Sequence, residues 1–168
     1  MSLLKRYVLQ ERNELMEQGI RIQVIGQMSR LPLFVRKPLN VLCKDSKDNH
    51  QMVLNLALSY GGRAEIVAAF RQLARDVTAG KIDADSITEQ MVTERLDTAG
   101  LPDPDLLIRT SGELRLSNFL LWQTAYTEMY VTDTHWPDFR EADLQSAFES
   151  FASRRRRFGK TDAQLDTE

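Results

Sequence analysis

The chain has 168 residues, and 42% of them are hydrophobic, which is enough for one domain with a substantial core and too few for two. Its formal net charge of −2 argues against nucleic acid as the main partner, because binding to a phosphate backbone usually goes with a basic surplus. The single cysteine, Cys43, excludes a disulfide within the chain, and with only His50 and His135 beside it no zinc-binding pattern is evident. No apolar run could cross a bilayer and no signal-peptide core opens the chain, so we expect a cytoplasmic protein whose only membrane contact is peripheral.

The first half of the chain alternates helical and strand patterns. Apolar residues at helical spacing predict a helix over residues 3–18, and Gly19 marks its end. An alternating strand over 20–25 follows, and then a helical stretch over 31–45 that Pro38 should kink or interrupt. A second apolar strand is expected over residues 52–58. Its turn, Tyr60-Gly61-Gly62-Arg63, leads into a helix that ends near Gly80.

The second half continues the alternation. A Ser-x-x-Glu capping box at Ser86 predicts a helix start; strands are then expected over 106–109 and 128–132, and helices over 118–125 and 141–156. Strands that alternate with helices and read as nearly continuous apolar runs predict an α/β fold, with a mostly parallel sheet flanked by helices. We expect a single α/β domain over residues 1–159 and a disordered tail over 160–168. Four strands are few for such a sheet and the chain opens directly in a helix, so N-terminal strands and helices are expected to be missing.

Two arginines mark the candidate site. Arg109 closes an apolar strand, at the carboxyl end where open α/β sheets bind ligands, and Arg115 follows across a glycine-containing turn. Ser117 precedes the predicted helix over 118–125, so its hydroxyl is expected to cap that helix while the first amides face an anion. Because a planar guanidinium can bond two phosphate oxygens at once, the group suits a diphosphate. The alternative is two surface arginines paired with Glu113 or Asp105, beside an ordinary helix cap.

Two further features have a functional and a structural interpretation. Glu128 begins the strand over 128–132, so its carboxylate should lie at a rim of the sheet. It could bind Mg²⁺ there only with a second acid from elsewhere; the alternative is an ordinary solvated glutamate. The basic run over 154–157, followed by Phe158 and Gly159, fits the last turn of a helix and its glycine stop.

The block from Arg109 to Gln123, followed by Tyr126, Glu128 and residues 136–139, closely resembles the signature of the cis-isoprenyl diphosphate synthases, the undecaprenyl diphosphate synthase family. The segments over 60–63 and 157–159 resemble further blocks of that family, in the family's order. The resemblance implies a cis-prenyltransferase fold. It also implies condensation of isopentenyl diphosphate with an allylic diphosphate, usually farnesyl diphosphate, to a long-chain product such as undecaprenyl diphosphate, the lipid precursor of cell walls.

The same resemblance implies roles for individual residues. Arg109, Arg115 and Ser117 would hold the diphosphate of isopentenyl diphosphate, and Glu128 would help to bind Mg²⁺. Arg157 and Gly159 would reach the substrate diphosphate in the neighbouring subunit of a homodimer. With the resemblance taken into account, the functional interpretation of the basic segment is favoured over the interpretation as a simple helix end.

Two family blocks have no match here. The Asp-Gly-Asn-Gly-Arg-Trp segment, whose aspartate is the family's principal magnesium ligand and catalytic acid, is absent from the sequence, and so is the Ser-x-x-Asn-Trp segment. The resemblance therefore covers the family's C-terminal two thirds, and no catalytic residue is assigned in this chain. We expect the chain alone to be inactive. The alternative is a non-catalytic partner or regulatory subunit of a prenyltransferase, although such a subunit has no need of the diphosphate-binding residues.

Overall fold

A computed structural model describes residues 2–154 of the chain, which divides into two compact units at Gly100. The first unit contains α1 (Ser2–Gln10), α2 (Arg12–Glu17), β1 (Ile20–Ile25), η1 (Met28–Arg30), α3 (Leu33–Asp45), β2 (Met52–Ala57), α4 (Gly62–Thr78), η2 (Ala84–Ser86) and α5 (Glu89–Thr93). The second contains β3 (Leu106–Arg109), β4 (Glu128–Val131), η3 (Trp136–Asp138) and α6 (Glu141–Ala152). Among these residues no helix is both long and apolar enough to span a bilayer.

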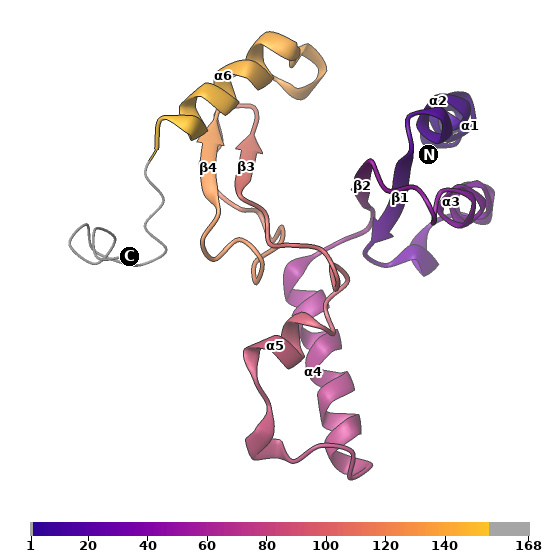
Figure 1. Ribbon diagram of the computed structural model, residues 1–168, viewed down its shortest axis with the longest axis vertical. Helices are drawn as coiled ribbons and strands as arrows, with labels where there is room; N and C mark the ends of the chain where they lie inside the picture. Colours follow the sequence, from indigo (N-terminus) through magenta and orange to yellow (C-terminus); the bar gives the residue numbers. More distant parts are fainter. Residues whose placement is uncertain (1, 155–168) are drawn as a thin grey trace. The chain divides into compact units, whose positions relative to one another are not determined.

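The first unit is built on a parallel pair of strands. β1 and β2 pair with Ile20 opposite Met52 and Ile25 opposite Ala57, and α1, α2 and α3 lie on one side of the pair (Figure 1). The core consists of six buried side chains of β1, α3 and the turn before α3: Ile20, Ile22, Leu31, Val35, Leu39 and Leu42. Burial of this apolar face stabilises the helices against the strands.

Two helices of the first unit depart from the sequence-based prediction. The helix predicted over 3–18 is interrupted at Glu11, between α1 and α2. By contrast, α3 continues through Pro38, where a kink or break was expected. Proline removes one backbone donor, but the neighbouring Val35 and Leu39 are fully buried, so packing of this face outweighs one lost hydrogen bond.

The second unit holds the other parallel pair. β3 and β4 pair with Leu106 opposite Glu128 and Arg109 opposite Val131, so Arg109 lies at the carboxyl end of this pair and Glu128 at its amino end. α6 packs against β4 (Figure 1). The parallel α/β arrangement is thus confirmed, and within residues 2–154 hydrogen bonds join the strands as two pairs rather than as one four-stranded sheet.

Three local predictions in the later part of the chain are wrong. Residues 118–125 form turns and no helix. The helix predicted from the capping box at Ser86 begins instead after Thr88, whose hydroxyl accepts a hydrogen bond from the Met91 amide at 3.3 Å. α6 ends at Ala152, four residues earlier than predicted. The single domain over 1–159 stays a prediction, and residues 160–168 lie outside the described residues.

Candidate functional site

Arg109 occupies the end of β3 that the sequence predicted. Its backbone carbonyl accepts a hydrogen bond from the Thr132 amide at 2.9 Å, which fixes it beside the end of β4. Its side chain is 31% exposed, and Nη2 donates to Oε2 of Glu113 at 2.5 Å. The Nε atom is enclosed without a hydrogen-bond partner, which leaves one buried donor of this guanidinium unsatisfied.

The turn after β3 is held against the segment after β4. The Ser111 amide donates to the Thr134 carbonyl at 3.0 Å, and the Gly112 amide donates to the Thr132 carbonyl at 2.9 Å. Gly112 has φ +68°, and a Cβ there would lie 2.6 Å from Oδ1 of Asp133. Only glycine therefore meets both the left-handed backbone and the close approach without a shift of the neighbour.

Arg115 meets Arg109 at a shared carboxylate. Nη2 of Arg115 donates to Oε1 of Glu113 at 2.5 Å, while the other oxygen of Glu113 accepts from Arg109. The hydrogen bond from Arg109 lowers the pKa of Glu113 below its ordinary value, and the charge of Arg115 adds to this effect. The structure thus brings the two arginines together through the Glu113 pairing that the alternative interpretation named.

Ser117 does not cap a helix. It has φ +49°, Asn118 has φ +64° and Leu120 has φ +44°, and left-handed residues cannot continue a right-handed helical ladder. The free amides of a helix N-terminus, which the sequence predicted here, are therefore not formed at this position. Ser117 is exposed two residues beyond Arg115, and its role towards a diphosphate stays a prediction.

Glu128 lies at the opposite end of the β3–β4 pair from Arg109. Its Oε2 accepts a hydrogen bond from Nη1 of Arg154 at 2.9 Å, and the same Nη1 donates to the Met129 carbonyl at 3.0 Å. A carboxylate is a suitable Mg²⁺ ligand. However, within residues 2–154 no group of three or more acidic, histidine or cysteine side chains could hold a metal ion. Glu128 thus offers one ligand to a metal site and not a whole one.

Arg157 and Gly159 lie outside the described residues.

The sequence did not predict the contact between Glu128 and Arg154. The two residues are 26 positions apart, and the sequence assigned Glu128 to a metal site and the basic run to a helix end or a substrate diphosphate.

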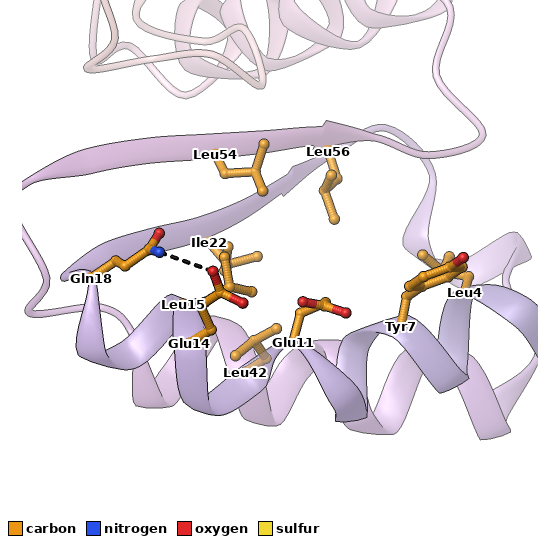
Figure 2. Close-up of a pocket in the computed structure, with 10 residues that line it drawn as sticks. All are labelled: Leu4, Tyr7, Glu11, Glu14, Leu15, Gln18, Ile22, Leu42, Leu54 and Leu56. Carbon is orange, nitrogen blue, oxygen red and sulfur yellow. Dashed lines mark hydrogen bonds between the residues drawn. The ribbon is translucent and has the colours of Figure 1, made fainter. Parts of the chain in front are cut away.

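An apolar cavity of about 300 Å³ lies in the first unit, and sequence reasoning missed it. Figure 2 shows it between the α1 and α2 helices on one side and β1 and β2 on the other. Its lining residues are Leu4, Tyr7, Glu11, Glu14, Leu15, Gln18, Ile22, Leu42, Leu54 and Leu56. Polar groups gather on the α2 side, where Gln18 Nε2 donates to Glu14 Oε1 at 3.0 Å. The available signal was alternation: Leu54 and Leu56 are two residues apart in β2 and therefore share the face that lines the cavity (Figure 2).

The family model described as putative undecaprenyl diphosphate synthase matches residues 1–159. The chain belongs to this family. Among the curated relatives, the isoprenyl transferase of Brucella abortus biovar 1 (strain 9-941) is 47% identical over 168 residues, which are 100% of this chain and 66% of that protein. The isoprenyl transferase of Bacillus cereus (strain ATCC 14579) is 49% identical over 146 residues, 87% of this chain and 57% of that protein. The chain therefore spans less than two thirds of the length of these family members.

Solved structures of the family agree with the fold. Lavandulyl diphosphate synthase from Lavandula x intermedia, in complex with dimethylallyl diphosphate, matches with a TM-score of 0.92 and 40% identity, over 95% of this chain and 70% of that one. A probable undecaprenyl diphosphate synthase from Campylobacter jejuni matches with a TM-score of 0.79 and 33% identity, over 95% and 72% of the two chains. The fold is thus that of the prenyl diphosphate synthases of this family.

Proposed function

We propose that this chain is part of a cis-prenyltransferase that condenses isopentenyl diphosphate with an allylic diphosphate, such as farnesyl diphosphate, to a long-chain polyprenyl diphosphate. The observation that carries the proposal is the convergence of Arg109 and Arg115 on one carboxylate at the carboxyl end of a parallel strand. A diphosphate brings several negative charges to such a pair, and each guanidinium keeps N–H groups beyond the one that Glu113 accepts. Ser117 would add a hydroxyl donor beside them.

The cavity of the first unit supports the hydrocarbon part of such a substrate. Its walls are mainly aliphatic side chains, and its volume of about 300 Å³ is at the lower end of the range for small-molecule pockets. An isoprenoid tail is an apolar ligand, so burial in such a cavity is favourable. The cavity therefore suits the hydrocarbon chain of the allylic substrate.

Magnesium belongs to this proposal as the cofactor of the whole enzyme. When bound, Mg²⁺ would neutralise charge on the departing diphosphate. Glu128 would provide one carboxylate ligand, and further ligands would come from outside the described residues. We also propose a homodimer in which Arg157 and Gly159 reach the diphosphate of a neighbouring subunit.

The half-site in this chain is expected to be weak. Three charge-assisted contacts contribute about 1.5 to 3 kcal/mol each, whereas association costs about 4 to 15 kcal/mol. We therefore expect an affinity for isopentenyl diphosphate no better than about millimolar, and no turnover by this chain alone.

An NMR titration of the ¹⁵N-labelled chain with isopentenyl diphosphate tests the proposal. Saturable shifts are expected in the amides of residues 109–117, and the Arg109→Gln variant should lose them. Arg71→Gln, which removes an exposed arginine of α4, is the matched control and should titrate like the unchanged chain. Equal shifts in all three proteins, or none in the loop of the unchanged chain, would refute the assignment.

A further inference from the structure

The structure assigns a positioning role to Glu113: its carboxylate holds the guanidinium groups of Arg109 and Arg115 in one place, so that a diphosphate meets a converged pair. This inference rests on the proposed function of the loop, and it concerns a residue that does not itself bind the ligand.

The geometry requires two acceptors on one side chain. Oε2 of Glu113 accepts from Arg109 and Oε1 accepts from Arg115, each through an Nη2 atom at 2.5 Å. A glutamine in this place has one acceptor oxygen, and its NH₂ group donates, so it cannot offer a separate oxygen to each guanidinium and carries no negative charge to offset their repulsion. The pairing of both arginines therefore depends on a carboxylate.

The two arginines would not converge by themselves. Guanidinium groups carry like charges, which repel each other at such short range. The side chain of Arg115 is 63% exposed, and a long exposed side chain samples many rotamers when nothing holds it. Glu113 opposes both effects. Its negative charge offsets the repulsion between the two guanidinium groups, and its hydrogen bonds restrict their rotamers before any ligand binds. Preorganisation of this kind raises affinity because the ordering has already taken place.

Glu113 itself is well placed for this role, because the backbone before it is anchored. Ser111 and Gly112 are hydrogen-bonded to the Thr134 and Thr132 carbonyls, and Gly112 is packed against Asp133. The group of two arginines and one glutamate keeps a net positive charge, so an anion is still attracted to it. Each arginine uses one nitrogen, Nη2, to bind Glu113, and Nε of Arg109 is enclosed, so Nη1 of each group is the nitrogen proposed to meet a ligand.

Simple electrostatics predicts the opposite outcome for the Glu113→Gln variant. A negative charge beside an anion site repels the ligand, so its removal alone should tighten binding. If Glu113 acts by positioning the arginines, its removal should weaken binding. The sign of the change therefore distinguishes the two effects.

The experiment uses the full chain, inorganic pyrophosphate as the probe, and NMR as the readout. For Glu113→Gln we expect an apparent Kd about tenfold higher than that of the unchanged chain, the effect of losing one preorganised contact, and greater mobility of the Arg109 and Arg115 Nε–H groups in ¹⁵N relaxation. Glu113→Asp, which keeps both oxygens, should restore most of the affinity. Glu149→Gln removes one charge elsewhere in the same unit, where Glu149 pairs with Gln145, and should leave both readouts unchanged.

A Kd for Glu113→Gln that is equal to or lower than that of the unchanged chain would overturn the inference, as would unaltered mobility of both Nε–H groups. The Thr132 and Thr134 amide shifts would reveal whether glutamine disturbs the turn. In that case Glu113→Ala serves as a second variant, and its apparent Kd for pyrophosphate should also be higher than that of the unchanged chain. If the unchanged chain does not bind pyrophosphate, the proposed function itself is refuted. If the unchanged chain binds pyrophosphate and the Glu113 variants bind it equally well, only the positioning role of Glu113 is refuted.

Discussion

At the scale of single residues, the site depends on how one glutamate and two arginines share their charges. Arg109 ends a strand, Arg115 follows six positions later, and Glu113 lies between them with one oxygen for each. The sequence predicted the position of both arginines and named Glu113 as an alternative partner. It could not show that the two pairings occur together, because that depends on the left-handed turn at Ser111 and Gly112.

The same three residues give a prediction on pH. Because Arg109 is the largest cause of the lowered pKa of Glu113, Arg109→Gln should raise that pKa towards the ordinary glutamate value, and Arg115→Gln should raise it less. A carboxyl group whose pKa is lower in the folded than in the unfolded protein stabilises the fold, and this contribution is complete at pH values above the unfolded-state pKa. It is lost as the pH falls through the folded-state pKa. The ion pairing should therefore persist into the acidic range below the ordinary pKa of glutamate.

Carboxyl ¹³C shifts of Glu113 against pH measure this directly. An ordinary pKa in the unchanged chain, or no change in Arg109→Gln, would contradict the account.

At the scale of elements, the strands were easier to predict than the helices. Residues 20–25 and 106–109 are strands as expected, and the strands expected over 52–58 and 128–132 each end one residue earlier. Short apolar runs bounded by turn signals are typical of buried strands. The segment over 118–125 misled the prediction, since its apolar and polar residues suit a helix. Asn118 and Leu120 within the segment, and Ser117 just before it, have left-handed backbone, which is a property of the folded loop that composition does not report.

The start of α5 gives a prediction at the same scale. The sequence pointed to Ser86 as the cap, but Thr88 accepts the Met91 amide, whereas the Ser86 hydroxyl donates to the Asp83 carbonyl at 2.7 Å. Thr88→Ala should lower the free energy of unfolding by about 1 kcal/mol, as is typical for loss of a helix cap. Ser86→Ala is the matched control and should cost less. Urea denaturation of the two variants decides it: a larger loss for Ser86→Ala would show that the capping box, and not Thr88, begins the helix.

At the scale of the whole molecule, family membership and function follow from different evidence. Membership follows from a family match over residues 1–159 and from relatives near 47% identity, and it confirms the resemblance found in the sequence. The activity is a proposal, because the chain spans 66% of the Brucella relative and, among residues 2–154, no group of three or more acidic, histidine or cysteine side chains could hold a metal ion. What the described residues do provide is a converged arginine pair and an apolar cavity, in two separately described units.

The central claim is that Arg109 and Arg115 act as one anion-binding group, and a double-mutant cycle tests it most directly. The apparent Kd of inorganic pyrophosphate is measured for the unchanged chain, Arg109→Gln, Arg115→Gln and the double variant. If both arginines contact one diphosphate, each single change should weaken binding, and the double variant should lose less than the sum of the two, since neighbouring groups with a shared partner are coupled by about 0.5–3 kcal/mol. Strictly additive losses, or single variants that bind as tightly as the unchanged chain, would contradict the account.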